Sequence, residues 1–188
     1  MVRAGITERR LKNRRFRKTE DAILRVFFEE DNYISLEQMA KKARVARSTI
    51  YRHHRAVREI VPDYEKYVLM RYRRVIRRMI RKKTPLRQIY FQMLLFILAN
   101  RQVFTLLLKS GDFMVLSRMI DELKMRVEKT ARIARSSDKI FKVYKGEVTV
   151  LIREWMKLGF NSGEMDKILE DIMYLTETAK TRLGSLKR

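Results

Sequence analysis

The sequence contains no cysteine, and only two prolines and six glycines among its 188 residues. Without cysteine the chain can form neither disulfides nor thiolate metal sites, and it cannot use a thiol in catalysis. The scarcity of proline and glycine leaves room for long helices. The longest apolar run, Met93–Ala99, is far too short to span a bilayer. The first residues are charged and lack the apolar region of a signal peptide, so we expect a cytoplasmic protein with no membrane partner.

Acidic residues are also few. The chain carries 22 Asp and Glu against 44 Lys and Arg, a net charge of +22. The positive charges in such an excess repel one another, and an excess of this kind is typical of proteins that bind a polyanion. Nucleic acid is the first candidate and an anionic membrane surface the second. Because 46% of the residues are hydrophobic, the chain can nevertheless bury a substantial core.

Apolar residues recur at spacings of three and four, and strand-like alternation does not persist. This periodicity predicts an all-α fold. The expected helices span residues 19–31, 36–43, from within 56–62 to about 82, 85–99, 101–110, 113–135, 138–158 and 164–183. Thr19, Ser35 and Thr84 are the expected N-caps, with Gln38 completing a capping box at Ser35.

Residues 1–18 contain eight Lys or Arg and a single acid. We predict a basic arm here, disordered in part until it binds a partner. Residues 19–60 then form the expected DNA-binding domain, and residues 61–188 a helical body for ligand binding and dimerisation.

The segment 36–55 has the spacing of a helix-turn-helix. Met39 and Ala40 would face the first helix, Val45 would fill the turn, and Ile50 would anchor the second motif helix. This arrangement leaves a set of residues at or near the outer surface, where they fit a DNA major groove: Arg47, Ser48, Thr49, Tyr51, Arg52 and His53.

Two stretches, TEDAILRVFF at 19–28 and MAKKARVARSTIYRHH at 39–54, resemble the N-terminal domain of TetR/AcrR-type transcriptional regulators. The spacing from Trp155 to Gly159 also resembles the region before that family's last helix. The resemblance implies a three-helix head with a helix-turn-helix and a larger effector-binding body. It also implies a homodimer formed by the last two helices, within 138–183, and a left-handed turn at Arg44, where the family usually has glycine.

The resemblance also implies roles for individual residues. Arg47 and Ser48 would read base edges, and Thr49, Tyr51 and His53 would contact phosphates or adjacent bases. The remaining predicted DNA contacts are Arg14, Arg15 and Arg17 of the arm, with Ser35, Arg52 and Arg55. Effector-pocket candidates in the body are Phe91, Phe96, Phe104 and Met114, although such residues usually belong to a core.

A second basic run, Arg71–Lys83, holds eight Lys or Arg and no acid. Its apolar residues keep helical spacing, so it predicts an amphipathic helix with a cationic face. The role of this face stays open among a solvated stripe, a contact with the DNA backbone, and attraction of an anionic effector.

We expect neither catalysis nor a cofactor, since there is no glycine-rich phosphate loop and no Ser–His–Asp pattern. The two histidines, His53 and His54, are adjacent and therefore point about 100° apart on a helix, unlike a metal-binding pair. The leading hypothesis is a homodimeric repressor on a pseudo-palindromic operator, released by a small-molecule effector. The alternatives are an architectural or mobile-element nucleic-acid-binding protein without effector and, third, a helical protein of membrane surfaces or RNA.

Overall fold

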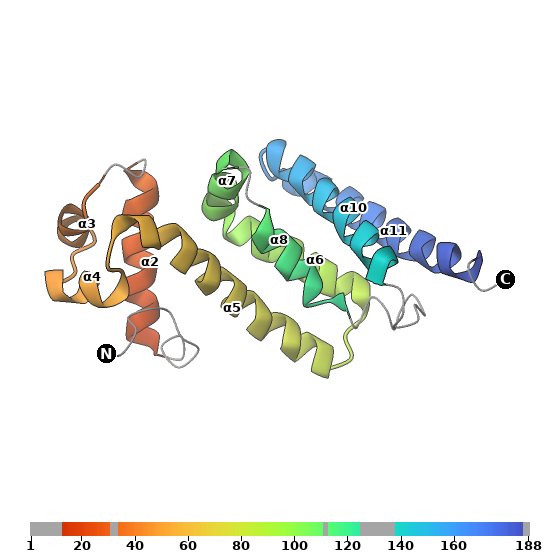
Figure 1. The fold of residues 1–188 in the computed structure, drawn as a ribbon, viewed down its shortest axis with the longest axis horizontal. Coiled ribbons are helices and arrows are strands. Elements are labelled where there is room, and N and C mark those ends of the chain that lie inside the picture. Colours follow the sequence, from red (N-terminus) through yellow and green to blue (C-terminus); the bar gives the residue numbers. More distant parts are fainter. Residues whose placement is uncertain (1–12, 31–33, 111–112, 125–137, 186–188) are drawn as a thin grey trace. The chain divides into compact units, whose positions relative to one another are not determined.

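The computed structural model describes residues 13–30, 34–110, 113–124 and 138–185, and all regular structure in these ranges is helical (Figure 1). The all-α prediction is confirmed. The chain forms two compact units, Met1–Arg71 and Tyr72–Arg188. Among the helices described, none is both long enough and apolar enough to cross a membrane.

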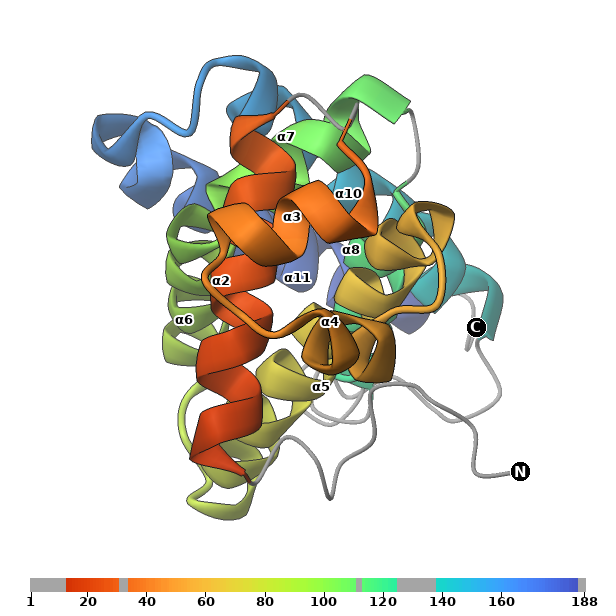
Figure 2. The ribbon, with the colours of Figure 1, turned by 90° about the vertical axis from the view of Figure 1, so that its left-hand side faces the viewer.

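The first unit contains α2 (Arg14–Glu29), α3 (Leu36–Lys42), α4 (Arg47–His53), the short 3-10 turn η1 (Val57–Glu59) and the beginning of α5 (Ile60–Arg81). Figure 2 shows α3 lying across α2, with the loop at 43–46 leading into α4. Large apolar side chains from each helix are buried between them: Ile23, Phe27, Met39, Ile50 and Ile60. The inward positions predicted for Met39, Ala40 and Ile50 are therefore confirmed.

Helix α2 begins five residues before the predicted start, so residues 14–18 of the expected arm are helical. The cap is Asn13, whose side-chain oxygen accepts hydrogen bonds from the backbone N–H groups of Arg15 and Phe16. The prediction of Thr19 as N-cap is wrong, because an asparagine cap further upstream satisfies the first free N–H groups. Residues 1–12 of the predicted arm lie outside the described residues.

Helix α3 and the turn after it follow local rules that the sequence displays. Ser35 Oγ accepts from Gln38 N at 3.2 Å, and Gln38 Oε1 accepts from Ser35 N at 3.0 Å, which confirms the capping box. Arg44 has a φ of 53°, the left-handed conformation expected there. For a non-glycine residue this conformation costs about 1 kcal/mol.

Helix α5 starts and ends where the sequence predicts. Pro62 lies in its first turn, where the missing N–H is not needed for an intrahelical bond. Helix α6 (Leu86–Ala99) begins one residue later than predicted, with Pro85 rather than Thr84 at the N-cap and no side-chain cap bond. The N-cap prediction for Thr84 is therefore wrong.

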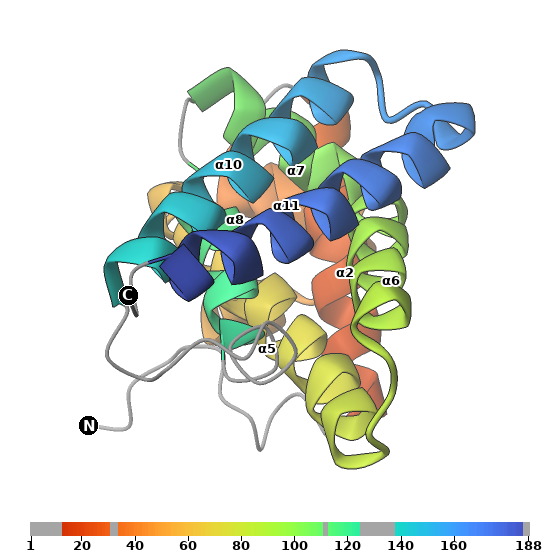
Figure 3. The same cartoon turned by 90° about the vertical axis from the view of Figure 1, so that its right-hand side faces the viewer.

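The second unit also contains α7 (Arg101–Ser110), α8 (Met114–Asp121), α10 (Asp138–Lys157), the turn η2 (Ser162–Glu164) and α11 (Met165–Ser185). Figure 3 shows α10 and α11 side by side, and α10 also packs against α7 and α8. Helix α8 ends at Asp121, so the predicted helix 113–135 is interrupted there. The rest of that prediction, from 125 on, falls on residues that the structure does not describe.

The predicted break between α10 and α11 is confirmed. Gly159 has a φ of +78°, which glycine adopts at little cost, and Phe160 follows it at +58°. Trp155 stabilises this turn, because its Nε1–H donates to the carbonyl of Asn161 at 2.8 Å and its ring meets Phe160 edge-on.

A chain of hydroxyls crosses the core of the second unit. The Tyr90 and Tyr144 hydroxyls lie 2.7 Å apart, and Tyr144 lies 3.0 Å from Thr176 Oγ1. Thr176 in turn donates to the carbonyl of Ile172. These contacts tie α6, α10 and α11 together without leaving their polar atoms unpartnered.

Candidate nucleic-acid interface

Helix α4 presents a polar face to solvent. Arg47, Ser48, Tyr51 and Arg52 are all exposed, whereas Ile50 is fully buried on the other side. At about 100° per residue, these four positions fall within an arc of about 140°. The helix therefore carries two guanidinium groups, a hydroxyl and a phenol on one continuous surface.

The side chains on this surface are held loosely enough to exchange partners. Arg47 is 70% exposed and pairs with Glu37 of α3, and its guanidinium lies 5.9 Å from the centre of the Tyr51 ring. Arg52 donates to Thr49 Oγ1 at 3.1 Å, so the half-buried Thr49 orients that arginine. Exposed ion pairs contribute only about 0–1 kcal/mol. Arg47 could therefore exchange its contact with Glu37 for one with a phosphate or a base edge at little cost in free energy.

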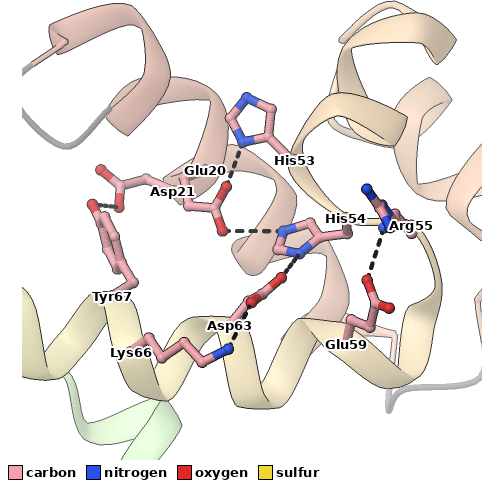
Figure 4. A network of polar contacts seen from close by, with 9 residues as sticks. All are labelled: Glu20, Asp21, His53, His54, Arg55, Glu59, Asp63, Lys66 and Tyr67. Carbon is pink, nitrogen blue, oxygen red and sulfur yellow. Dashed lines mark hydrogen bonds and ion pairs between the residues drawn. The ribbon is translucent and has the colours of Figure 1, made fainter. Parts of the chain in front are cut away.

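The opposite side of α4 ends in a buried polar network (Figure 4). Glu20 of α2 is fully buried, and its two carboxylate oxygens face the imidazoles of His53 and His54. Asp63 of α5 faces the other nitrogen of His54 at 3.4 Å. Two acids and two histidines thereby connect α2, the end of α4 and the start of α5.

His53 corrects a prediction. It was expected on the outer surface as a contact to DNA, but it is only 6% exposed and bonds to Glu20 through Nδ1. Phe16 stacks on its other side, with ring centres 4.2 Å apart and planes 11° from parallel. His53 therefore positions the end of α4 against α2, and its side chain has no free path to DNA.

The electrostatics of the network favour charged groups. Burial by itself raises the pKa of Glu20, but the close contacts and charges of the two imidazoles outweigh it, and the pKa lies below its ordinary value. Burial by itself lowers the pKa of His54, but the close contact and charge of Glu20, with those of Asp63, outweigh it and raise the pKa. Both ring nitrogens of His54 face acceptor-only carboxylates, the arrangement that suits the doubly protonated ring.

The contacts in this network differ in quality. His54 Nε2 lies 3.0 Å from Glu20 Oε1, which is ion-pair distance, but the direction of approach falls short of a hydrogen bond. The contact between His53 and Glu20 is both short and well directed. Glu20 is therefore attached to α4 chiefly through His53 and interacts with His54 mainly through charge.

A second contact joins α2 to α5 in the first unit. The Tyr67 hydroxyl donates to Asp21 Oδ1 at 3.0 Å, and Arg71 lies 3.9 Å from the same oxygen. Burial, with the charge of Asp21, raises the pKa of Tyr67 above its ordinary value, so the hydroxyl stays a donor.

The other predicted DNA contacts lie in several places. Arg14 and Arg15 are exposed in the first turn of α2, whereas Arg17 is half-buried with a buried Nε that lacks a hydrogen-bond partner. The hydroxyl of Ser35 is occupied by the capping box. Arg55 is exposed just after α4, and its backbone N–H donates to Glu59.

The sequence reasoning missed Glu20 and Asp63. Glu20 falls on the apolar stripe of α2 with Ile23 and Phe27, at the three-and-four spacing that marks a buried face. An acid in that stripe, in a chain whose only histidines are adjacent, was the available signal for a buried ion pair.

The four effector-pocket candidates differ in their burial and surroundings. Phe104 is fully buried and belongs to the core, whereas Phe96 is half-buried and meets Tyr72 edge-on with ring centres 5.5 Å apart. Met114 is 55% exposed. Phe91 lines an open groove between α5 and α6.

No family model, curated protein or solved structure matches the chain. Within the described ranges, no group of three or more His, Asp or Glu side chains is arranged to hold a metal ion. A function for this protein must therefore be inferred from its own residues.

Proposed function

We propose that this chain is a DNA-binding transcriptional regulator in which α3, the turn at Arg44 and α4 act as a helix-turn-helix. The single observation that carries the proposal is the exposed face of α4, with Arg47, Ser48 and Arg52 directed to solvent. A helix of this kind fits the major groove, where arginine recognises guanine through two hydrogen bonds. The net charge of +22 supports a partner with many negative charges, such as DNA.

The roles of the residues follow from their positions. Arg47 and Ser48, at the start of α4, would contact base edges. Tyr51 and Arg52, one turn further, would contact phosphates or adjacent bases, with Arg55 after the helix. The buried Glu20 network acts beneath them as a support that sets the angle of α4 on α2.

We further propose that the protein works as a homodimer through α10 and α11. Val143 and Val150 are exposed on α10 at a spacing of seven, which places them on the same face, and Tyr174 is exposed on α11. Exposed apolar residues that gather on one helix face are typical of subunit interfaces. A two-fold dimer would match a pseudo-palindromic operator.

The test is selection of bound fragments from random duplex DNA, followed by a salt titration of the selected site. We expect a short palindrome. If about 6–10 phosphates are neutralised, affinity should fall ~10³–10⁵-fold between about 50 and 200 mM salt. Selection without any sequence preference would favour the architectural protein over the regulator, and affinity independent of salt would contradict both.

Arg47→Gln separates base reading from general attraction. If Arg47 contacts a base, the variant should bind the selected site about 5–100-fold more weakly and lose preference at one position, corresponding to about 1–3 kcal/mol. The matched control is Arg101→Gln, which removes the same charge from an exposed position of α7. Equal losses in the two variants would contradict the role assigned to α4.

A further inference from the structure

A groove of about 590 Å³ opens between α5 and α6 in the second unit. Helix α5 contributes Arg74, Val75, Arg78 and Met79, and α6 contributes Phe91 with two glutamines. The volume lies within the range of about 300–1,000 Å³ that is typical of small-molecule sites. Among the described residues, no carboxylate lines the groove.

The arginines of this groove differ from their neighbours on α5. Arg73 and Arg77 pair with Glu122, and Arg71 pairs with Asp21. Arg74 and Arg78 have no acidic partner among the residues that the structure describes. Their spacing of four places both guanidinium groups on the same side of the helix, where together they attract one anion.

Besides the two arginines and two glutamines, the groove is lined by apolar side chains. Val75 is 40% exposed, and Met79 and Phe91 are half-buried, so hydrocarbon surface is open to solvent directly beside the two cations. Phe91 offers an aromatic wall and Met79 an adaptable one. Inorganic phosphate or a DNA backbone would use the charges but would leave this apolar surface uncovered.

We propose that this groove binds a small organic anion with an aromatic body. Its carboxylate would lie between Arg74 and Arg78, and its ring would pack against Val75, Met79 and Phe91. The two glutamines can donate further hydrogen bonds to the carboxylate or to ring substituents. The site assigns a role to part of the basic run Arg71–Lys83 and does not depend on whether the protein binds DNA.

The experiment is isothermal titration of the full chain with 2-naphthoate as probe, beside the neutral 2-naphthalenemethanol. We expect 2-naphthoate to bind with a Kd below ~1 mM and the neutral compound at least ~10-fold more weakly, because it lacks the charge that the arginines recognise. Absence of naphthoate binding up to ~10 mM, or equal binding of the two compounds, would overturn the proposal.

Two matched pairs of variants locate the site. At the exposed Val75, Val75→Glu should abolish naphthoate binding by repelling the carboxylate, whereas Val75→Lys should retain it. Arg74→Gln with Arg78→Gln should weaken binding ~10-fold or more, whereas Arg81→Gln with Lys82→Gln removes the same charge outside the groove and should change it less than ~2-fold. If both members of either pair behave alike, the proposal is wrong.

A parallel titration with mixed-sequence duplex DNA completes the test. If Arg74→Gln with Arg78→Gln weakens DNA binding but leaves naphthoate binding unchanged, the arginines are phosphate contacts and the groove is not an anion site. Loss of naphthoate binding with unchanged DNA affinity supports the site as proposed. Since the naphthoate titrations contain no DNA, their failure would leave the proposed function of α4 intact.

Discussion

Replacing Glu20 by glutamine removes the charge at the centre of the buried network while keeping the size of the side chain. The variant leaves His53 and His54 facing a neutral amide in a site without water access. Breaking a buried ion pair by removing one partner costs about 3–5 kcal/mol. We expect the lower end, about 3 kcal/mol, because His54 can release its proton and Asp63 still faces its other nitrogen.

The loss should depend on pH in a defined direction. The pKa of His54 is raised in the folded chain, so its contribution to stability is full below its ordinary value of 6.5 and is lost as pH rises through the folded pKa. The pKa of Glu20 is lowered, so its contribution is full above 4.5 and is lost as pH falls through the folded pKa. The free energy of unfolding of wild type should therefore exceed that of Glu20→Gln most between about pH 4.5 and 6.5. The difference should shrink as the pH rises through the folded pKa of His54.

Urea unfolding followed by circular dichroism measures this loss. With a slope of about 1–3 kcal/mol per molar urea, a loss of ~3 kcal/mol lowers the midpoint by ~1–3 M. Fluorescence of Trp155, the only tryptophan, reports on the second unit. The urea midpoint followed by this fluorescence should therefore shift less than the midpoint followed by circular dichroism.

The matched control is Glu29→Gln, an exposed acid on the same helix without an ion pair among the described residues. The free energy of unfolding of this control should stay within ~0.5 kcal/mol of the wild-type value. If Glu20→Gln unfolds at the wild-type midpoint near pH 6, or loses the same stability across the whole pH range, then charge in the network does not stabilise the first unit.

Three further predictions concern stability and assembly. Arg44→Gly should raise the free energy of unfolding by ~0.5 kcal/mol, because relief of left-handed strain exceeds the added freedom of the unfolded chain; lower stability in urea would contradict it. Tyr144→Phe should lower the free energy of unfolding by ~1–3 kcal/mol, because it interrupts the buried hydroxyl chain. Tyr72→Phe removes a buried hydroxyl that has no hydrogen-bond partner among the described residues, so it should be neutral or stabilising. A lower thermal midpoint for Tyr72→Phe than for Tyr144→Phe would contradict this reasoning. If the protein is the proposed homodimer, Val143→Glu combined with Val150→Glu should convert it to monomer in sedimentation velocity without loss of helix. A variant that still sediments as a dimer would contradict the interface proposed on α10 and α11.

Several local features of the chain could be predicted because the physics that produces them is local. The capping box joins Ser35 to a residue three positions away. The left-handed conformation of Arg44, in contrast, was expected only from the resemblance to a family with glycine at that position. The break at Gly159 is set by that residue's own conformational freedom. The start of α2 was misplaced by five residues although Asn13 caps it by the same kind of local contact, and the start of α6, which no side chain caps, was misplaced by one residue.

The role of His53 could not be predicted in the same way. Helical spacing places His53 about 60° from the buried Ile50, on the side of α4 opposite the exposed residues, so its burial was available from the sequence. Its partner was not, because Glu20 lies 33 positions away and reaches His53 only through the packing of α4 on α2. Phe16 stacks on the same imidazole. A residue expected to contact DNA is therefore a support for the residues that we propose contact it.

The sequence by itself determined the helical fold, the caps and turns that use neighbouring residues, and the exposed polar set at Arg47–Arg52, since periodicity and short-range hydrogen bonds decide these. Only the tertiary structure decided which charges are buried together and which have no acidic partner among the described residues. Glu20 and His54 are paired while Arg74 and Arg78 face an open groove, although nothing in the sequence distinguishes these arginines from Arg73 and Arg77. The reason is that ion pairing depends on which helices pack side by side, and that is settled by the whole core.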